Sequence, residues 1–168
     1  MTIVANNKLL QTSIDYLSQD QNGSLVQDRE SLSWDIDDAV ASTVVFKPGY
    51  FVALGANKGA QAVAASTPAS GLLGVVKYQI SGVIDAQGYP ASLYSNIPVL
   101  KKGVILVPAA STVDVDAVPY LVVDPAQTAT YGKILNGSGS GAIDISAFSK
   151  VVKKTNSNGY CELDINII

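Results

Sequence analysis

The apolar positions are densest over residues 97–108, IPVLKKGVILVP. Two short apolar runs flank Lys101-Lys102-Gly103, which predicts a β-hairpin whose Gly103 takes the left-handed position of a three-residue loop. Residues 104–107 are apolar at every position, so both faces of that strand are expected to meet protein. In a small domain the second face often belongs to a neighbour. The pattern therefore favours an assembling protein over an enzyme.

The chain from residue 44 onward has the pattern of an all-β domain. Lys47-Pro48-Gly49 is typical of a tight turn, with proline at its first corner and glycine next. Apolar segments separated by Gly, Pro or Asn-Gly recur at roughly 8–12-residue intervals, as in sandwiches and small barrels. The expected strands are 44–46, 50–54, 60–65, 72–78, 83–84, 91–94, 118–123, 131–135, 143–148 and 161–168. We predict a small β-barrel, β-clip-like or sandwich domain over residues 44–168.

The first part of the chain is acidic, polar and irregular in pattern. Residues 1–46 carry seven acidic and two basic side chains, whereas the remainder carries seven acidic and nine basic ones. One face of a short helix, marginal in isolation, is outlined by four apolar residues, Leu9, Leu10, Ile14 and Leu17. We predict an extended N-terminal arm over residues 1–43. This composition fits an arm that becomes ordered on a partner, and equally a solvated strap on its own domain.

Composition excludes several classes of function. The chain contains no histidine, which removes Ser-His and Cys-His catalytic pairs, histidine metal sites and the usual proton shuttle at neutral pH. Arg29 is its single arginine and the net charge is −3, so nucleic-acid binding is not expected. Cys161 lies in an alternating, strand-like run and is interpreted as a buried structural thiol. We expect a non-enzymatic protein with no cofactor.

The sequence also bears on where the protein is made. No apolar run approaches the roughly 18 residues that a membrane span needs, and the N-terminus has no basic segment leading into an apolar one. We therefore expect no membrane partner and synthesis in a cytoplasm.

Two local patterns resemble functional sites. Residues 136–141, NGSGSG, look like a phosphate-binding loop but lack the Lys-Ser/Thr ending and precede a strand-like segment. Asp114 and Asp116 are two apart on an expected strand and could in principle hold Ca²⁺. We interpret the first as a mobile surface loop and the second as a solvated strand face, so no metal site is predicted.

Six residues are candidates for contacts with a partner. Trp34 stands among acidic residues and with Leu32 could anchor the arm in a pocket, although Trp34 could equally cap its own core. Lys101 and Lys102 would keep the hairpin tip soluble or contact acidic neighbours. The apolar face of the following strand adds Val104 and Leu106.

The order of several motifs resembles the structural cement or head-decoration proteins of tailed bacteriophages. The series comprises Lys47-Pro48-Gly49, Gly71 to Val76, Val99 to Val107, Pro119 to Val123, Gly132-Lys133, and Gly159 with Glu162 to Ile165. The resemblance covers roughly residues 44–168. The chain departs from the pattern in its long acidic N-terminus, and in having Pro119-Tyr120 where a Gly-Asp turn is common.

This resemblance implies a virion structural protein. Such a protein would bind the outer surface of the phage head, bridge neighbouring copies of the major capsid protein and stabilise the shell. Family members are small β-barrel or β-clip-like domains, often trimeric, so a homo-oligomer is expected. Two other classes stay open, a carbohydrate- or receptor-binding β module of a tail or adhesin, and an enzyme that uses carboxylates alone.

Overall fold

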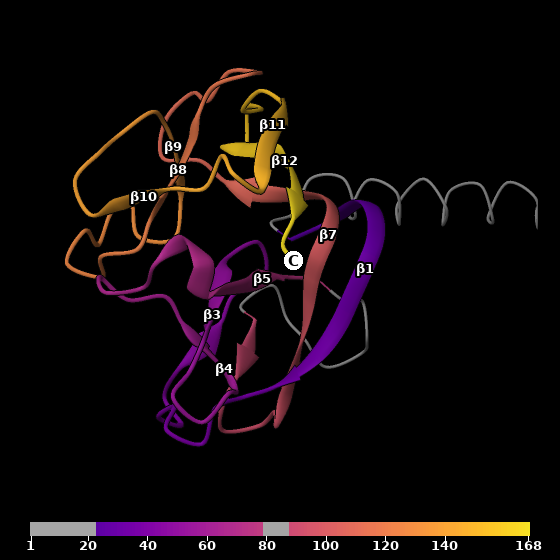
Figure 1. Ribbon diagram of the computed structural model, residues 1–168, viewed down its shortest axis with the longest axis vertical. Helices are drawn as coiled ribbons and strands as arrows, with labels where there is room; N and C mark the ends of the chain where they lie inside the picture. The colour runs from indigo at the N-terminus through magenta and orange to yellow at the C-terminus, as the bar shows by residue number, and fades with distance from the viewer. Residues whose placement is uncertain (1–22, 79–87) are drawn as a thin grey trace, which may run out of the picture.

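The computed structural model describes residues 23–78 and 88–168, and its regular secondary structure is almost entirely β-strand (Figure 1). The expected helix around Leu9 to Leu17 and the expected strand at 83–84 lie outside these residues. The strands are β1 (Leu25–Asp35), β2 (Val45–Phe46), β3 (Phe51–Leu54), β4 (Ala60–Ala62), β5 (Leu72–Val76), β6 (Tyr89–Pro90), β7 (Asn96–Pro108), β8 (Pro119–Val122), β9 (Ile134–Asn136), β10 (Ala142–Asp144), β11 (Ser149–Lys153) and β12 (Tyr160–Asn166), with one 3₁₀ turn, η1 (Ala69–Gly71). The all-β prediction is confirmed.

The strands form three antiparallel sheets. The largest has seven strands in the order β11-β12-β7-β5-β3-β4, with β1 paired to β7 as a branch. A three-stranded sheet, β10-β8-β9, and a two-stranded sheet, β2-β6, complete the fold. Figure 1 shows β1 and β7 running side by side over a long distance.

The predicted hairpin at 97–108 is wrong, because these residues lie within the single continuous strand β7. Lys102 pairs with Glu30 of β1 on one side and with Asn166 of β12 on the other, which leaves no room for a turn. The predicted positive φ at Gly103 is confirmed, at +147°. Its cause differs, since a Cβ at residue 103 would overlap the carbonyl oxygen of Gln27 in β1. Glycine here permits close packing of two backbones.

The prediction of an irregular arm is wrong for residues 25–35, which form β1 and pair with β7 from Asn96 to Ile105. Period-two alternation is absent from this segment because register shifts interrupt it between Leu25 and Gln27, and on both sides of Glu30. A strand with bulges and many charges does not show the pattern by which strands are recognised.

The buried apolar side chains form two core clusters, and both include residues of the seven-stranded sheet. The first includes Leu100, Ile105, Val107 and Cys161, and the second includes Ile97. Strand β7 therefore contributes to both. The interpretation of Cys161 as a buried thiol is confirmed, because the residue is fully buried and burial raises its pKa to about 12. At neutral pH the thiol stays protonated and is a poor nucleophile.

The apolar run 104–107 is covered mainly by the chain itself. Ile105 and Val107 belong to the first core, Leu106 is 3% exposed, and Val104 is partly buried. A neighbouring molecule is not required to cover this strand, so the run no longer argues for self-assembly.

Of the other local predictions, some are confirmed and some are wrong. The turn at Lys47-Pro48-Gly49 is confirmed, with φ +81° at Gly49 and a 3.2 Å hydrogen bond from the Tyr50 N–H to the Lys47 carbonyl. The strand expected at 91–94 is wrong, because these residues form a turn after β6. The mainly polar strand β11 was not predicted. Within the described ranges, no helix is long and apolar enough to cross a membrane.

Asp37 is a buried carboxylate that fixes the segment after β1. It is 2% exposed and accepts hydrogen bonds from the backbone N–H groups of Ala39 (2.9 Å), Asn57 (2.8 Å) and Gly59 (3.3 Å). These bonds, that from Ala39 above all, hold the pKa of Asp37 below its usual value. The carboxylate thereby joins two loops that are distant in the sequence.

The depressed pKa predicts acid sensitivity. Because the folded state holds Asp37 ionised, its contribution to stability is present above the unfolded-state pKa of 3.8 and is lost as pH falls through the lower folded-state pKa. We expect Asp37→Asn to lower the urea midpoint at neutral pH and to reduce the further loss on acidification. Asp114→Asn, at an exposed carboxylate, is the control. Parallel pH profiles for wild type and Asp37→Asn would contradict this assignment.

Candidate functional site

The six residues selected from the sequence lie on two adjacent strands. Leu32 and Trp34 are in β1, and the other four, Lys101, Lys102, Val104 and Leu106, are in β7. The two strands pair directly, with Leu32 opposite Val99 and Trp34 opposite Ile97. The structure therefore brings the six positions onto two neighbouring strands, with Leu106 just beyond the last β1–β7 pair, although the hairpin that suggested four of them does not exist.

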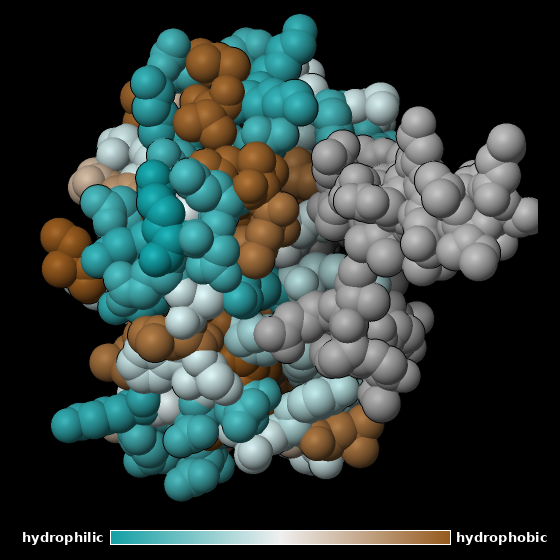
Figure 2. All heavy atoms as spheres, turned by 90° about the vertical axis from the view of Figure 1, so that its right-hand side faces the viewer, coloured by the Kyte–Doolittle hydropathy of each residue, from teal (hydrophilic) through white to brown (hydrophobic). Residues whose placement is uncertain are grey.

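These residues differ in how much of each side chain is exposed and so available to a partner. Leu32 is 42% exposed, and Val26 of the same strand is 53% exposed. Trp34 packs against the second core of its own chain, and its buried indole N–H has no hydrogen-bond partner in the described part of the chain. Leu106 is buried. The most exposed apolar side chains of the two strands are thus on β1. Figure 2, which views the molecule from the right-hand side of Figure 1, shows separate apolar patches among polar groups.

Three of the four charged residues of β1, namely Asp28, Arg29 and Glu30, form ion pairs within the chain. Lys102 Nζ lies 2.8 Å from Glu30 Oε2, and the hydrogen bond with Lys102 holds the pKa of Glu30 below its usual value. Arg29 pairs with Asp164 of β12, and Lys77 Nζ lies 3.3 Å from a carboxylate oxygen of Asp28. Exposed pairs of this kind contribute little to stability. They accompany the register in which β1 pairs with β7, and one of them engages Lys102 within the chain.

A shallow depression adjoins the ladder and was not predicted. It measures about 510 Å³ and is lined by residues of β1, β7, β11 and β12, including Arg29, Lys102, Phe148 and Lys150. Four segments from distant parts of the sequence form it, which no local motif reveals. Its basic and aromatic side chains extend the surface beside β1.

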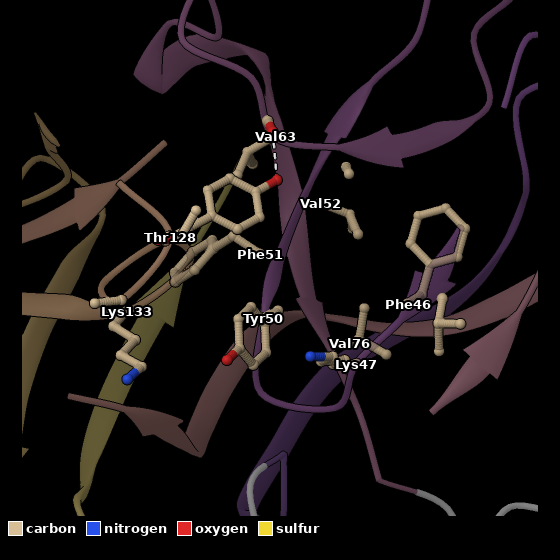
Figure 3. A pocket seen from close by; sticks show the side chains of 13 residues that line it. Phe46, Lys47, Tyr50, Phe51, Val52, Val63, Val76, Thr128 and Lys133 are labelled. Atoms are coloured by element: carbon tan, nitrogen blue, oxygen red, sulfur yellow. Dashed lines mark hydrogen bonds between the residues drawn. The ribbon is translucent and has the colours of Figure 1, made fainter. Parts of the chain in front are cut away.

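A second concave site lies between the two larger sheets (Figure 3). This cleft, about 330 Å³, is lined on one side by residues around β3 and on the other by residues 128–133. Tyr131 donates a 2.5 Å hydrogen bond to the Val63 carbonyl, which joins the two sides. Lys47 Nζ lies 5.9 Å from the centroid of the Tyr50 ring, within cation–π range. Burial raises the pKa of both tyrosines.

The patterns that resembled chemical sites do not come together. Asp116 pairs with Lys150 at 3.0 Å and has φ +66°, so it lies in a turn and not on the expected strand. Among residues 23–78 and 88–168, no three His, Cys, Asp or Glu residues are grouped so as to hold a metal ion. The side chains gathered at the described sites are suited to noncovalent contact.

The described residues form a small antiparallel all-β fold with exposed apolar side chains on β1 and a cleft beside β3. The model of the structural cement protein family (E217 gp24/Pam3 gp6) matches residues 18–166. A solved chain from the capsid of Myoviridae phage XM1 has a similar fold, with a TM-score of 0.66 and 18% sequence identity. That similarity covers 88% of this chain and 91% of the other. The comparison with curated proteins gave no match.

Because the family model spans most of the chain, this protein belongs to the structural cement protein family. The resemblance found in the order of short sequence motifs is confirmed. The match begins at residue 18, so it also includes β1, which those motifs did not cover.

Proposed function

We propose that this protein is a non-enzymatic cement component of a bacteriophage head. It attaches to the outer surface of the capsid, bridges neighbouring copies of the major capsid protein and stabilises the shell against internal pressure. It is made in the host cytoplasm and assembled there onto the head. Membership of the structural cement protein family carries this proposal, and the similar fold of a chain from a phage capsid supports it.

The outer surface of β1 is the best-supported attachment site for the capsid protein. Val26 and Leu32 expose apolar area along one long strand, and an apolar patch with a polar rim is a common design of protein interfaces. Lys101 and the partly buried Val104 extend this surface onto β7. Trp34 packs against the second core and Leu106 is buried, so neither offers much surface, and Lys102 is paired with Glu30 of β1.

Two finer features belong to the same proposal. The N-terminal residues that precede β1 would run over the capsid or onto an adjacent copy. Residues 1–22 carry two acidic side chains and one basic one, which gives the segment a slight acidic excess. The protein would act as a homo-oligomer, with a trimer implied by the family resemblance alone. A carbohydrate- or receptor-binding module is the less favoured function, because the family match points to a cement role.

Co-sedimentation with empty, expanded capsid shells tests the attachment surface. We expect Val26→Ser with Leu32→Ser to weaken binding about tenfold or more, since loss of well-buried apolar contacts at an interface costs over about 1 kcal/mol. Val118→Ser with Val152→Ser removes similar apolar area elsewhere, at 48% and 38% exposed valines, and should leave binding unchanged.

The outcomes separate the function from its site. Wild-type protein that does not co-sediment with shells would contradict the cement function. Equal binding by wild type and the β1 variant would leave the function standing and assign attachment to another surface. Matching circular dichroism spectra and urea midpoints establish that the variants are folded.

A further inference from the structure

The cleft offers two cationic groups that have no acidic partner among the described residues. Five basic residues of the described chain are held in ion pairs, namely Arg29, Lys77, Lys102, Lys150 and Lys153. Lys47 and Lys133 line the cleft and take part in none of these pairs, and within residues 23–78 and 88–168 no acidic residue lines it. The remaining lining is largely apolar or aromatic, including Phe46 and Val76. A matching occupant combines carboxylates with an apolar side chain.

The same chain carries a surface of this composition beside the end of β1. Asp35 and Asp38 are exposed and form no ion pair within the described residues. Leu93 lies in the turn after β6 and is 76% exposed, more than any other described large apolar side chain except the C-terminal Ile168. All three border one depression of about 570 Å³. We call Asp35, Asp38 and Leu93 the acidic turn.

The acidic turn is held in place by its neighbours. Asp35 pairs with Asn96 of β7, and the N–H of Ile36 donates a 2.8 Å hydrogen bond to the Ser95 carbonyl. The Leu93 N–H donates to the Pro90 carbonyl at 3.0 Å. A projecting leucine on a fixed turn loses little conformational entropy when it enters a cavity, which favours binding.

From these two surfaces we infer that the acidic turn of one copy of this chain seats in the cleft of a second copy. Leu93 enters the apolar part of the cleft, and the carboxylates of Asp35 and Asp38 face Lys47 and Lys133. Because the two surfaces are different parts of the chain, the contact is heterologous unless two copies exchange it reciprocally. A heterologous contact closes into a ring or continues from copy to copy. The inference does not depend on capsid binding.

Sedimentation velocity of the full chain at low ionic strength, without shells, is the test. Wild type should self-associate more weakly as salt is added. Lys47→Glu with Lys133→Glu, and separately Asp35→Lys with Asp38→Lys, should each weaken association about tenfold or more, because like charges then face each other. An equimolar mixture of the two variants should restore it, since complementary charges then meet.

Controls distinguish the contact from a general charge effect. Lys58→Glu with Lys154→Glu makes the same charge change at exposed lysines outside the cleft and should associate as wild type does. Leu93→Ser should weaken association without any charge change. Wild type that stays monomeric, a mixture that fails to recover, or a control that behaves like the cleft variant would each overturn the inference. Unchanged thermal midpoints show that all variants are folded.

Discussion

Replacing Gly103 by valine is expected to lower the free energy of unfolding by about 3 kcal/mol or more, because strain and overpacking act together. Residue 103 has φ +147°, and a Cβ there would overlap the Gln27 carbonyl oxygen in β1. It also pairs with Ile165 of β12, so the backbone is confined on both sides. Valine must either displace β1 or break the ladder. Urea unfolding followed by circular dichroism measures the loss.

Gly137→Ala provides the matched control. Gly137 also has a positive φ, +94°, but a Cβ there would meet nothing within 4 Å. Only the conformational cost of about 1 kcal/mol is then expected. If the two variants unfold at the same urea concentration, the close approach of β1 to β7 does not constrain residue 103.

Removal of residues 1–43 is expected to unfold the protein or to leave it without cooperative unfolding. The deletion removes β1, which pairs with β7 along most of its length, together with Trp34 and the buried carboxylate of Asp37. Side chains of the second core, such as Ile97 and Val99, would then face water. Circular dichroism and thermal unfolding of the purified fragment provide the measurement.

Removal of residues 1–22 is the companion experiment. This shorter deletion takes away none of the described strand pairs, so a folded protein with cooperative unfolding is expected. Co-sedimentation of this fragment with shells then reports on the N-terminal segment in attachment, without a loss of fold. A folded 44–168 fragment would show that β1 is not needed by the domain and would reinstate the boundary at residue 43.

The sequence predicted the features that depend on short segments. The Pro48-Gly49 turn and most strands from residue 44 onward follow from local apolar runs and turn residues. The error at Lys101-Lys102-Gly103 has a clear origin, because charged residues and glycine between apolar runs are also what a bulged central strand contains. Lysine is tolerated at residue 102 because its side chain is 37% exposed and lies opposite Glu30 of β1.

The sites depend on contacts between distant segments, and sequence reasoning found them only in part. Leu32 was selected and is exposed, whereas Leu106 was selected and is buried. The cleft joins residues around Lys47 to residues around Lys133, and no pattern along the chain relates the two. The acidic turn combines Asp35 and Asp38 with Leu93, which no pattern along the chain relates to them and which the pairing of β1 with β7 brings near.

The continuity of β7 has a mechanical consequence. Its first residues pack into the second core and its later residues into the first, while β1 pairs along both parts. A pull along the direction of these strands loads the ladder hydrogen bonds together, as in shear, and does not break them one after another from an end. Tension applied to one part of the molecule would thus be transmitted through the single continuous strand β7 to the other part. This property suits a protein that reinforces a capsid shell under load.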